Sequence, residues 1–235
     1  MTPKVLIYHI YTGGDQDMLA YNLSHMATYA DKFEKCFLKI TCNNPEKERK
    51  LLDPYIKGSR FPRTQILEYA NDPRIGENVG LIDCLAKIKN EYNGDVDIFF
   101  ASTNGVSKKD ETVKKNIRAW VRAMTHLGLH NFDLVDEVFD SGYHCLGSFK
   151  RDVMMEKGGP YPCPWHYSGL FYWIRGKELF KRNWKFLADC RHGIEMYPGY
   201  LFTTQESYCL FNTQQDMYHE ELKDEQWLEK LRLSV

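Results

Sequence analysis

Polar and small residues follow directly on an apolar run near the middle of the chain. Residues 96–101 are apolar apart from one aspartate, and they continue into Ser102, Thr103, Asn104 and Gly105. A buried strand of an open α/β sheet ends in this way where its carboxyl end meets a ligand crevice. Hydroxyl, amide and main-chain groups there could bind a ligand, with Gly105 permitting a tight turn. An ordinary turn made of the same residue types is the alternative.

A second candidate site lies in the aromatic, proline-containing residues 161–169. This stretch holds His166 and Ser168, and an apolar run begins directly after Gly169. Its prolines predict a rigid loop before a strand, which would hold the imidazole and the hydroxyl in fixed positions. Such a histidine is a candidate for contact with phosphate or with a reacting hydroxyl. A histidine whose hydrogen bonds serve only the fold is the alternative.

The seven cysteines show no Cys-x-x-Cys spacing. An odd number of scattered cysteines favours reduced thiols in the cytosol over a disulfide framework. Cys163 and His166 could bind zinc together with His144 and Cys145, but no second compact pair supports this site. Nucleophilic chemistry by the same Cys–His pair is equally weakly supported.

Length and composition indicate one domain over residues 1–235. The chain is 43% hydrophobic and 14% aromatic, which is enough to bury a full core. Its formal net charge of -1 gives no overall attraction to nucleic acid or to anionic membranes. Without an apolar run of about 18 residues or a cleavable signal, a soluble, cytoplasmic protein is expected.

Hydrophobic periodicity predicts alternating strands and helices. Strands are expected at residues 5–11, 36–41, 65–69, 96–101, 143–147 and 170–174. Helices are expected at residues 18–33, 44–54, 81–92, 111–127, 134–139, 177–187 and 220–233. This alternation is typical of α/β proteins with a mainly parallel sheet between helices. Such a sheet brings the carboxyl ends of its parallel strands to one edge, where ligands bind.

The two polar segments together resemble a known family. The chain resembles small bacterial and viral glycosyltransferase-like proteins of the GT-A type, whose central strand runs into His-Thr-Lys-Gly-Val-Ser and whose later loop is similar to His-Tyr-Ser-Gly-Asn-Phe-Trp-Trp. Here the segments are Ser-Thr-Asn-Gly-Val-Ser at residues 102–107 and His-Tyr-Ser-Gly-Leu-Phe-Tyr-Trp at residues 166–173. The helix between them carries Trp120 and Met124, as in that group. The motifs fall within residues 76–175.

The resemblance implies a GT-A-like fold, that of nucleotide-diphospho-sugar transferases, with a mixed, mainly parallel sheet. It implies transfer of a sugar from a nucleotide-sugar donor to a glycan or another hydroxyl acceptor. The residues expected at the donor site are Tyr8, Thr12, Gly13, Asn78, Gly80, Ser102, Thr103, Asn104, Gly105, Arg122, Ser168 and Gly169. Tyr8 or Tyr11 would stack on the base, although a single aromatic in a strand belongs more often to the core.

Proteins of this fold usually neutralise the diphosphate with Mn²⁺ or Mg²⁺ at an Asp-x-Asp motif just after the central strand. Asp95 and Asp97 match the pattern but lie at the beginning of that strand. Asp97 is therefore a weak metal ligand candidate. Metal-free binding by main-chain N–H groups of residues 103–105, with Arg118 or Arg122, is the favoured model.

An inverting transfer needs a group that accepts the proton of the acceptor hydroxyl. His166 and Glu206 are the expected catalytic residues. The rival carboxylates are Asp152, Glu156 and Glu195. A retaining mechanism remains open at this point.

Two departures from the family segment motivate alternative functions. Ser102 and Asn104 stand where the family has histidine and lysine, so a cation that would steady a diphosphate is missing. One alternative is a non-catalytic protein that binds nucleotide-sugars or glycans with a decayed site. The other is glycosylation of modified DNA bases, which the near-neutral charge disfavours unless a basic patch forms.

Overall fold

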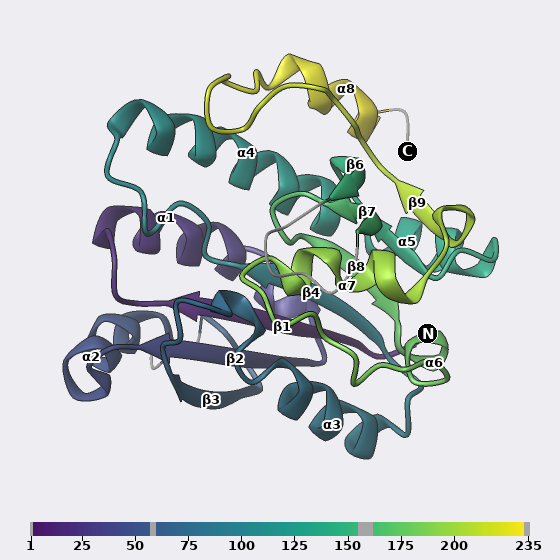
Figure 1. Ribbon diagram of the computed structural model, residues 1–235, viewed down its shortest axis with the longest axis horizontal. Helices are drawn as coiled ribbons and strands as arrows, with labels where there is room; N and C mark the ends of the chain where they lie inside the picture. The colour runs from purple at the N-terminus through teal and green to yellow at the C-terminus, as the bar shows by residue number, and fades with distance from the viewer. Residues whose placement is uncertain (1, 57–59, 155–161, 233–235) are drawn as a thin grey trace.

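The computed structural model describes residues 2–56, 60–154 and 162–232, which form a seven-stranded sheet between helices (Figure 1). In spatial order the strands are β3 (Thr64–Ala70), β2 (Lys35–Cys42), β1 (Lys4–Tyr11), β4 (Asp97–Ser102), β8 (Tyr172–Arg175), β5 (Cys145–Gly147) and β9 (Ser207–Cys209). β8 runs antiparallel to β4 and β5, whereas the other neighbouring pairs are parallel. The expected fold class, a mixed and mainly parallel sheet flanked by helices, is confirmed.

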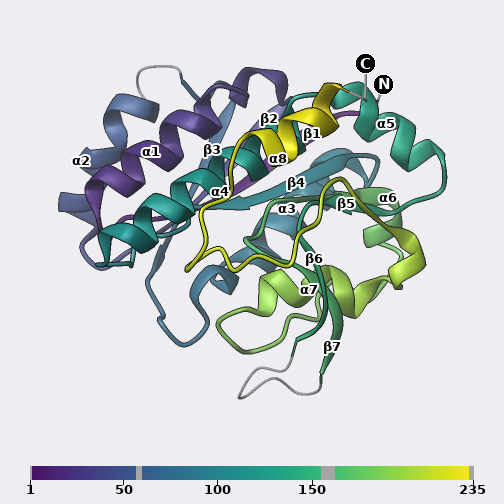
Figure 2. The same cartoon turned by 90° about the horizontal axis from the view of Figure 1, so that it is seen from above.

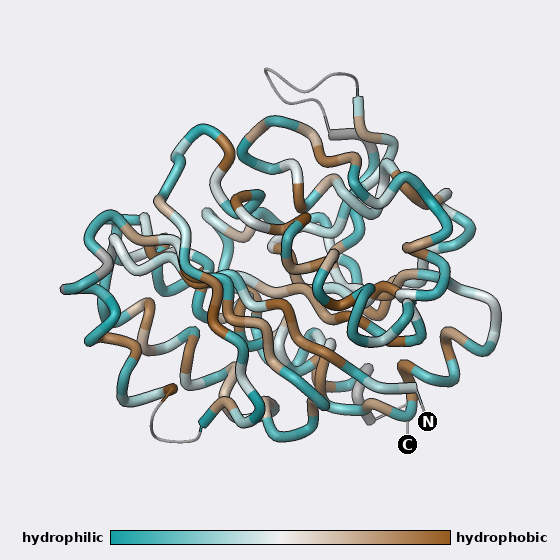
Figure 3. Tube along the Cα trace, turned by 90° about the horizontal axis from the view of Figure 1, so that it is seen from below, coloured by the Kyte–Doolittle hydropathy of each residue, from teal (hydrophilic) through white to brown (hydrophobic). Residues whose placement is uncertain are grey.

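Helices cover both faces of this sheet (Figure 2). One face carries α1 (Gln16–Ala27), α2 (Pro45–Ile56), α4 (Glu111–Leu129), α5 (Phe132–Asp140) and α8 (Glu225–Arg232). The other face carries α3 (Leu81–Tyr92), α6 (Gly176–Leu179) and α7 (Gly193–Leu201). Figure 3 shows hydrophobic segments gathered in the strands at the middle of the molecule, as burial on both faces requires. In the three described stretches, every helix is too short or too polar to cross a bilayer.

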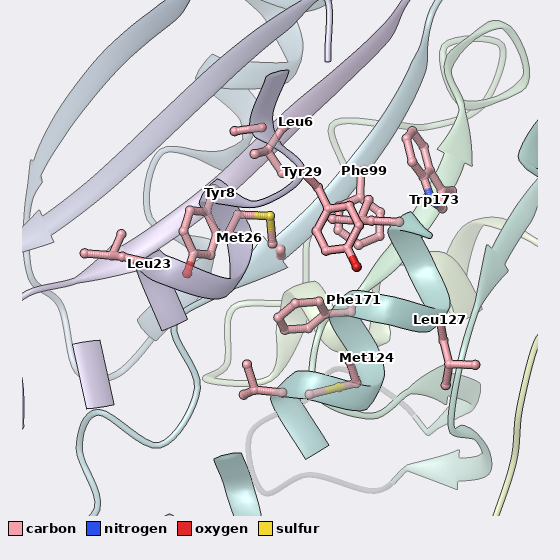
Figure 4. Packing of buried hydrophobic residues seen from close by; sticks show 14 of the residues in the cluster. Leu6, Tyr8, Leu23, Met26, Tyr29, Phe99, Met124, Leu127, Phe171 and Trp173 are labelled. Atoms are coloured by element: carbon pink, nitrogen blue, oxygen red, sulfur yellow. The ribbon is translucent and has the colours of Figure 1, made fainter. Parts of the chain in front are cut away.

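Side chains of β1 alternate between the two cores, because successive residues of a strand point to opposite faces. Ile7 packs on the α3 side and Tyr8 on the α1 side. Figure 4 shows Tyr8 beside Leu23 and Met26 of α1. Tyr8 is 1% exposed, and burial raises the pKa of its phenol well above the usual value. The expected stacking of Tyr8 on a base is corrected, because its ring fills the core.

The helices that follow β1 and β4 begin side by side. Asp15 caps α1 by accepting the N–H of Met18 at 2.8 Å, and Asp110 caps α4 by accepting the N–H of Val113 at 2.9 Å. Lys114 Nζ lies 2.7 Å from Asp15 Oδ2 and joins the two helix starts. Its hydrogen bond lowers the pKa of the Asp15 carboxyl. The loops after β1 and β4 are therefore held at one edge of the sheet.

The rigid loop expected before β8 is wrong, because residues 163–167 form a strand. This strand, β7 (Cys163–Tyr167), pairs antiparallel with β6 (Lys150–Met154) in a separate two-stranded sheet. Proline is tolerated in a strand that has one free edge, since no ladder hydrogen bond is lost there. The helix expected at residues 177–187 is also too long, because α6 ends at Leu179.

Gly199 lets α7 pack closely on β7, so replacement of Gly199 by alanine should destabilise the protein. A Cβ atom at this position would lie 1.7 Å from the carbonyl oxygen of Trp165, which is backbone and cannot rotate away. Overpacking of this kind lowers the free energy of unfolding by about 1–3 kcal/mol. Urea denaturation of Gly199→Ala measures the loss. A midpoint equal to that of the wild type would contradict the close packing of α7 on β7.

Candidate functional site

A cavity of about 290 Å³ opens at the carboxyl ends of β1, β2 and β4. Its floor is formed by strand residues His9, Tyr11, Thr41 and Ser102. The remaining lining residues lie in loops, in the 3-10 helix Gly76–Asn78 and at the start of α7: Asn71, Pro73, Gly76, Glu77, Thr103, Asn104, Gly105, Val106, Ser107, Lys108, Leu170, Arg191, His192, Ile194, Glu195 and Tyr218. The cavity lies at the edge where the sequence predicted a crevice. Four of the expected donor residues, at positions 102–105, line it.

Residues 103–105 continue β4 and then turn sharply. The Thr103 N–H donates to the carbonyl oxygen of His9 at 3.0 Å, and the Thr103 hydroxyl accepts the N–H of Tyr11 at 3.0 Å. Gly105 has φ +76°, and a Cβ there would lie 2.7 Å from Met18. Glycine is therefore required at the turn, on both conformational and packing grounds.

Asn104 joins the two polar segments that the sequence singled out. Its Nδ2 donates to the carbonyl oxygen of Gly169 at 2.8 Å, and its main-chain N–H donates to Asn22 Oδ1 at 3.1 Å. The Gly169 N–H in turn donates to Glu195 Oε1 at 2.7 Å. The β4 loop, the turn before β8 and the first turn of α7 thus form one connected wall. Asn104 stabilises this wall with its amide.

His166 lies on β7 and is 9% exposed. Its Nε2 is 3.3 Å from the hydroxyl of Ser168. Burial, with the charges of Arg151 and His192, lowers the pKa of His166 to about 4. The imidazole is therefore neutral at physiological pH. Neither His166 nor Ser168 is among the residues that line the cavity. Gly169 donates its N–H to Glu195, and Glu195 does line the cavity.

Asn78 supports the wall opposite the β4 loop. Its Nδ2 donates to the carbonyl oxygens of Ala188 at 2.8 Å and Cys190 at 2.7 Å. Arg74 and Asp189 form an ion pair of 2.8 Å across the same two loops. Asn78 therefore positions residues 188–192 and does not itself line the cavity.

Three other expected donor residues, Thr12, Gly13 and Gly80, contact neighbouring segments of the protein. Thr12 is 1% exposed, and its hydroxyl hydrogen-bonds to Glu48 at the start of α2. A Cβ at Gly13 would lie 2.5 Å from the side chain of Asn43. Gly80 has φ +70°, and a Cβ there would lie 2.2 Å from a tyrosine ring of β3. None of the three lines the cavity as the described residues form it.

Arg122 and Arg118 face other helices. Arg122 Nη2 lies 2.5 Å from Asp224 Oδ1, next to α8. The guanidinium of Arg118 lies 5.8 Å from the ring centre of Tyr21 in α1. The expected contribution of Arg118 or Arg122 to diphosphate binding is corrected, because both side chains are directed at helix contacts.

Glu206 and Asp97 lie at the opposite edge of the sheet. Asp97 begins β4, and Glu206 directly precedes β9, which runs in the same direction as β4. Glu206 pairs with Arg182 at 2.5 Å and closes a capping box with Thr203. Asp97 is 1% exposed, and burial raises its pKa to about 7. The structure therefore does not bring the expected base or the expected metal ligand to the cavity.

The rival carboxylates differ in position. Asp152 lies on β6 and lines a separate hollow, Glu156 lies outside the described residues, and Glu195 lines the main cavity.

The pairing of Cys163 with His166 is not supported. The two residues are three positions apart on one strand, so their side chains point to opposite faces. Among residues 2–56, 60–154 and 162–232, no three His, Cys, Asp or Glu side chains are grouped as metal ligands.

The sequence analysis missed several residues of the cavity. Those that carry polar or charged groups are His9, Thr41, Asn71, Glu77, Lys108, Arg191, His192 and Tyr218. Lys108 Nζ lies 4.4 Å from the ring centre of Tyr218, which comes from the segment before α8. His9 had a detectable signal, because a histidine inside an otherwise apolar buried strand needs a polar partner. The loop residues carried no such signal.

No family model matches the chain, and no curated protein matches its sequence. Among solved structures, the mannosyltransferase PcManGT from Pyrobaculum calidifontis, in complex with GDP-Man and Mn²⁺, is similar with a TM-score of 0.45 and 10% sequence identity. The match covers 83% of this chain and 50% of that chain, so this chain spans about half the length of that protein.

Proposed function

We propose that the protein is a glycosyltransferase that moves a sugar from a nucleotide-sugar donor to a hydroxyl group of an acceptor. The observation that carries the proposal is the meeting of residues 102–107 and 166–173 at one cavity, through the 2.8 Å hydrogen bond from Asn104 to Gly169. The cavity lies at the carboxyl ends of parallel strands, where α/β folds bind ligands. A ligand bound there would contact both segments that carry the family resemblance.

Two cationic side chains supply the charge that a diphosphate leaving group requires. Lys108 and Arg191 both line the cavity. In the proposed complex they neutralise the diphosphate, a role that preorganised cations perform in phosphoryl and glycosyl transfer. A role for Mn²⁺ or Mg²⁺ remains a prediction. Asp97 does not fit such a metal, because it lies at the opposite edge of the sheet.

Glu195 is the proposed general base, in place of His166 and Glu206. One of its oxygens accepts the Gly169 N–H at 2.7 Å, which fixes the carboxylate at the cavity. In the proposed step the acceptor oxygen bonds to the anomeric carbon, the bond from that carbon to the diphosphate breaks, and the hydroxyl proton passes to Glu195. A single displacement of this kind inverts the anomeric configuration.

Nucleotide binding and turnover test the proposal directly. Thermal unfolding is measured with nucleoside diphosphates and nucleotide-sugars, each with and without Mn²⁺. A ligand at about 100 times its Kd should stabilise the folded protein by about 2.7 kcal/mol. With an acceptor present, a transferase releases free nucleoside diphosphate, whereas a non-catalytic binding protein retains affinity without turnover. Absence of any stabilisation would overturn the proposal.

Replacement of Arg191 by glutamine should weaken binding of the nucleoside diphosphate about tenfold. A charge-assisted hydrogen bond contributes about 1.5–3 kcal/mol, and 1.4 kcal/mol corresponds to a factor of ten. Isothermal titration calorimetry measures the Kd. Arg49→Gln is the matched control, because Arg49 is 59% exposed on α2 and pairs with Glu68. Equal affinities of Arg191→Gln and the wild type would remove Arg191 from the site.

A further inference from the structure

Three polar side chains form a row beneath the cavity. His9 of β1 is the register partner of Ser102 in β4 and of Lys39 in β2. Register partners point to the same face of a sheet. His9, Ser102 and Lys39 are 4%, 1% and 0% exposed, respectively. Three neighbouring central strands therefore each bury a polar side chain at the same level.

Two atoms of this row have no hydrogen-bond partner within the described parts of the chain: His9 Nδ1 and Ser102 Oγ. The other imidazole nitrogen, Nε2, lies 2.8 Å from the hydroxyl of Thr41, and the Lys39 ammonium donates to the carbonyl oxygen of Glu77. A buried polar group without a partner destabilises a fold by about 1–3 kcal/mol. Both His9 and Ser102 are among the residues that line the cavity.

The imidazole of His9 is neutral. Burial, assisted by the charge of Lys39, lowers the pKa of His9 well below its usual value. A neutral imidazole donates through one nitrogen and accepts through the other, whereas a hydroxyl does both. For either tautomer, the row is complemented by a ligand that presents one donor and one acceptor side by side.

We propose that His9 and Ser102 bind the Watson–Crick edge of a nucleobase, at which a hydrogen-bond donor and an acceptor are adjacent. This inference rests on the proposed function and adds the donor base to it. The buried side chains of Leu170 and Ile194 line the same cavity and match the apolar faces of a flat ring. Phosphate oxygens accept hydrogen bonds but do not donate them, and the cations suited to them, Lys108 and Arg191, lie in the loops.

The test measures the Kd of UDP, GDP, CDP and ADP, and of the four corresponding nucleosides, by titration calorimetry. The wild type should prefer one of the four bases. Ser102→Ala should weaken the preferred nucleotide and its nucleoside by the same factor, about tenfold. Ser148→Ala is the matched control and should bind as the wild type does. Ser148 is also a buried serine, 3% exposed, whose hydroxyl has no partner among the described residues, but it lies outside the cavity.

Two variants of His9 locate the atom that matters. The amide of asparagine reaches the position of Nδ1, and the amide of glutamine reaches that of Nε2. His9→Asn should therefore retain more of the base preference than His9→Gln. Circular dichroism and thermal unfolding show whether each variant is folded.

The outcomes separate this inference from the proposed function. If the wild type binds no nucleotide, both are overturned. If it binds nucleoside diphosphates without base preference, or if Ser102→Ala binds the preferred base as tightly as the wild type, the inference falls and the transferase proposal stands. If Ser102→Ala weakens nucleotide-sugars but not nucleosides, the row contacts the sugar, which also overturns the assignment to the base.

Discussion

Replacement of Glu195 by glutamine should lower kcat by about 10²- to 10⁴-fold, the usual contribution of a general base. The glutamine side chain keeps an oxygen that can accept the Gly169 N–H, which the structure places 2.7 Å from Glu195 Oε1. The wall of the cavity should therefore be retained, and the Kd of the nucleoside diphosphate should change little. Rates are measured as release of nucleoside diphosphate at saturating donor and acceptor.

Glu206→Gln tests the carboxylate that the sequence analysis expected as the base, whereas Glu195→Gln tests the carboxylate that lines the cavity. Glu206 pairs with Arg182 at the far edge of the sheet, so this variant should keep kcat within about threefold of the wild type, well short of the loss of a base. Loss of turnover in Glu206→Gln together with full activity in Glu195→Gln would reverse the assignment. The anomeric configuration of the product gives an independent check, because a retained configuration is incompatible with a single displacement.

Asp97 should make the protein less stable as the pH rises from 4 to 8. Burial raises the pKa of this carboxyl from 3.8 to about 7, so the folded protein binds the proton more tightly than the unfolded chain does. The stabilisation is complete below the pKa of the unfolded chain and is lost as the pH rises through about 7. At 1.36 kcal/mol per pKa unit, the full change is about 4 kcal/mol.

The matched variant is Asp97→Asn, which has nearly the same shape and does not titrate. Urea denaturation of both proteins at several pH values isolates the contribution of Asp97, since the other titrating groups are common to both. The free energy of unfolding of the wild type should fall relative to that of Asp97→Asn as the pH rises. A constant difference between pH 4 and pH 8 would show that the pKa of Asp97 is the same in the folded and unfolded states.

Periodicity was sufficient to predict the layers of the fold and one side of the cavity. The strands at the centre are buried on both faces, so their apolar runs stand out from the helices between them. The abrupt change from apolar to polar residues after β4 marked residues 102–105 as the end of a strand at a crevice. All four line the cavity. This part of the site depends on local sequence and was therefore predictable.

The position of Glu195, the proposed general base, was not predictable in this way. Whether a residue lies at the carboxyl edge depends on the direction and order of strands that are distant in sequence. β8 runs antiparallel between β4 and β5, and β9 then pairs parallel with β5, which places Glu206 at the amino edge. Glu195 reaches the cavity because α7 packs on β7. The two prolines of residues 161–169 led to the prediction of a loop where this strand lies. Neither arrangement leaves a periodic signal.

Strands form the floor of the cavity, whereas loops form much of its rim, and this difference matters for engineering. His9, Thr41 and Ser102 belong to the hydrogen-bonded sheet, where a change of residue also perturbs the core. Residues 71–75, two of which line the cavity, form a loop, and loops tolerate exchange far better than strands do. A combinatorial library confined to this loop would vary one rim of the cavity while leaving the strand floor and Arg191 unchanged, so one scaffold could yield a series of proteins with different ligand preferences.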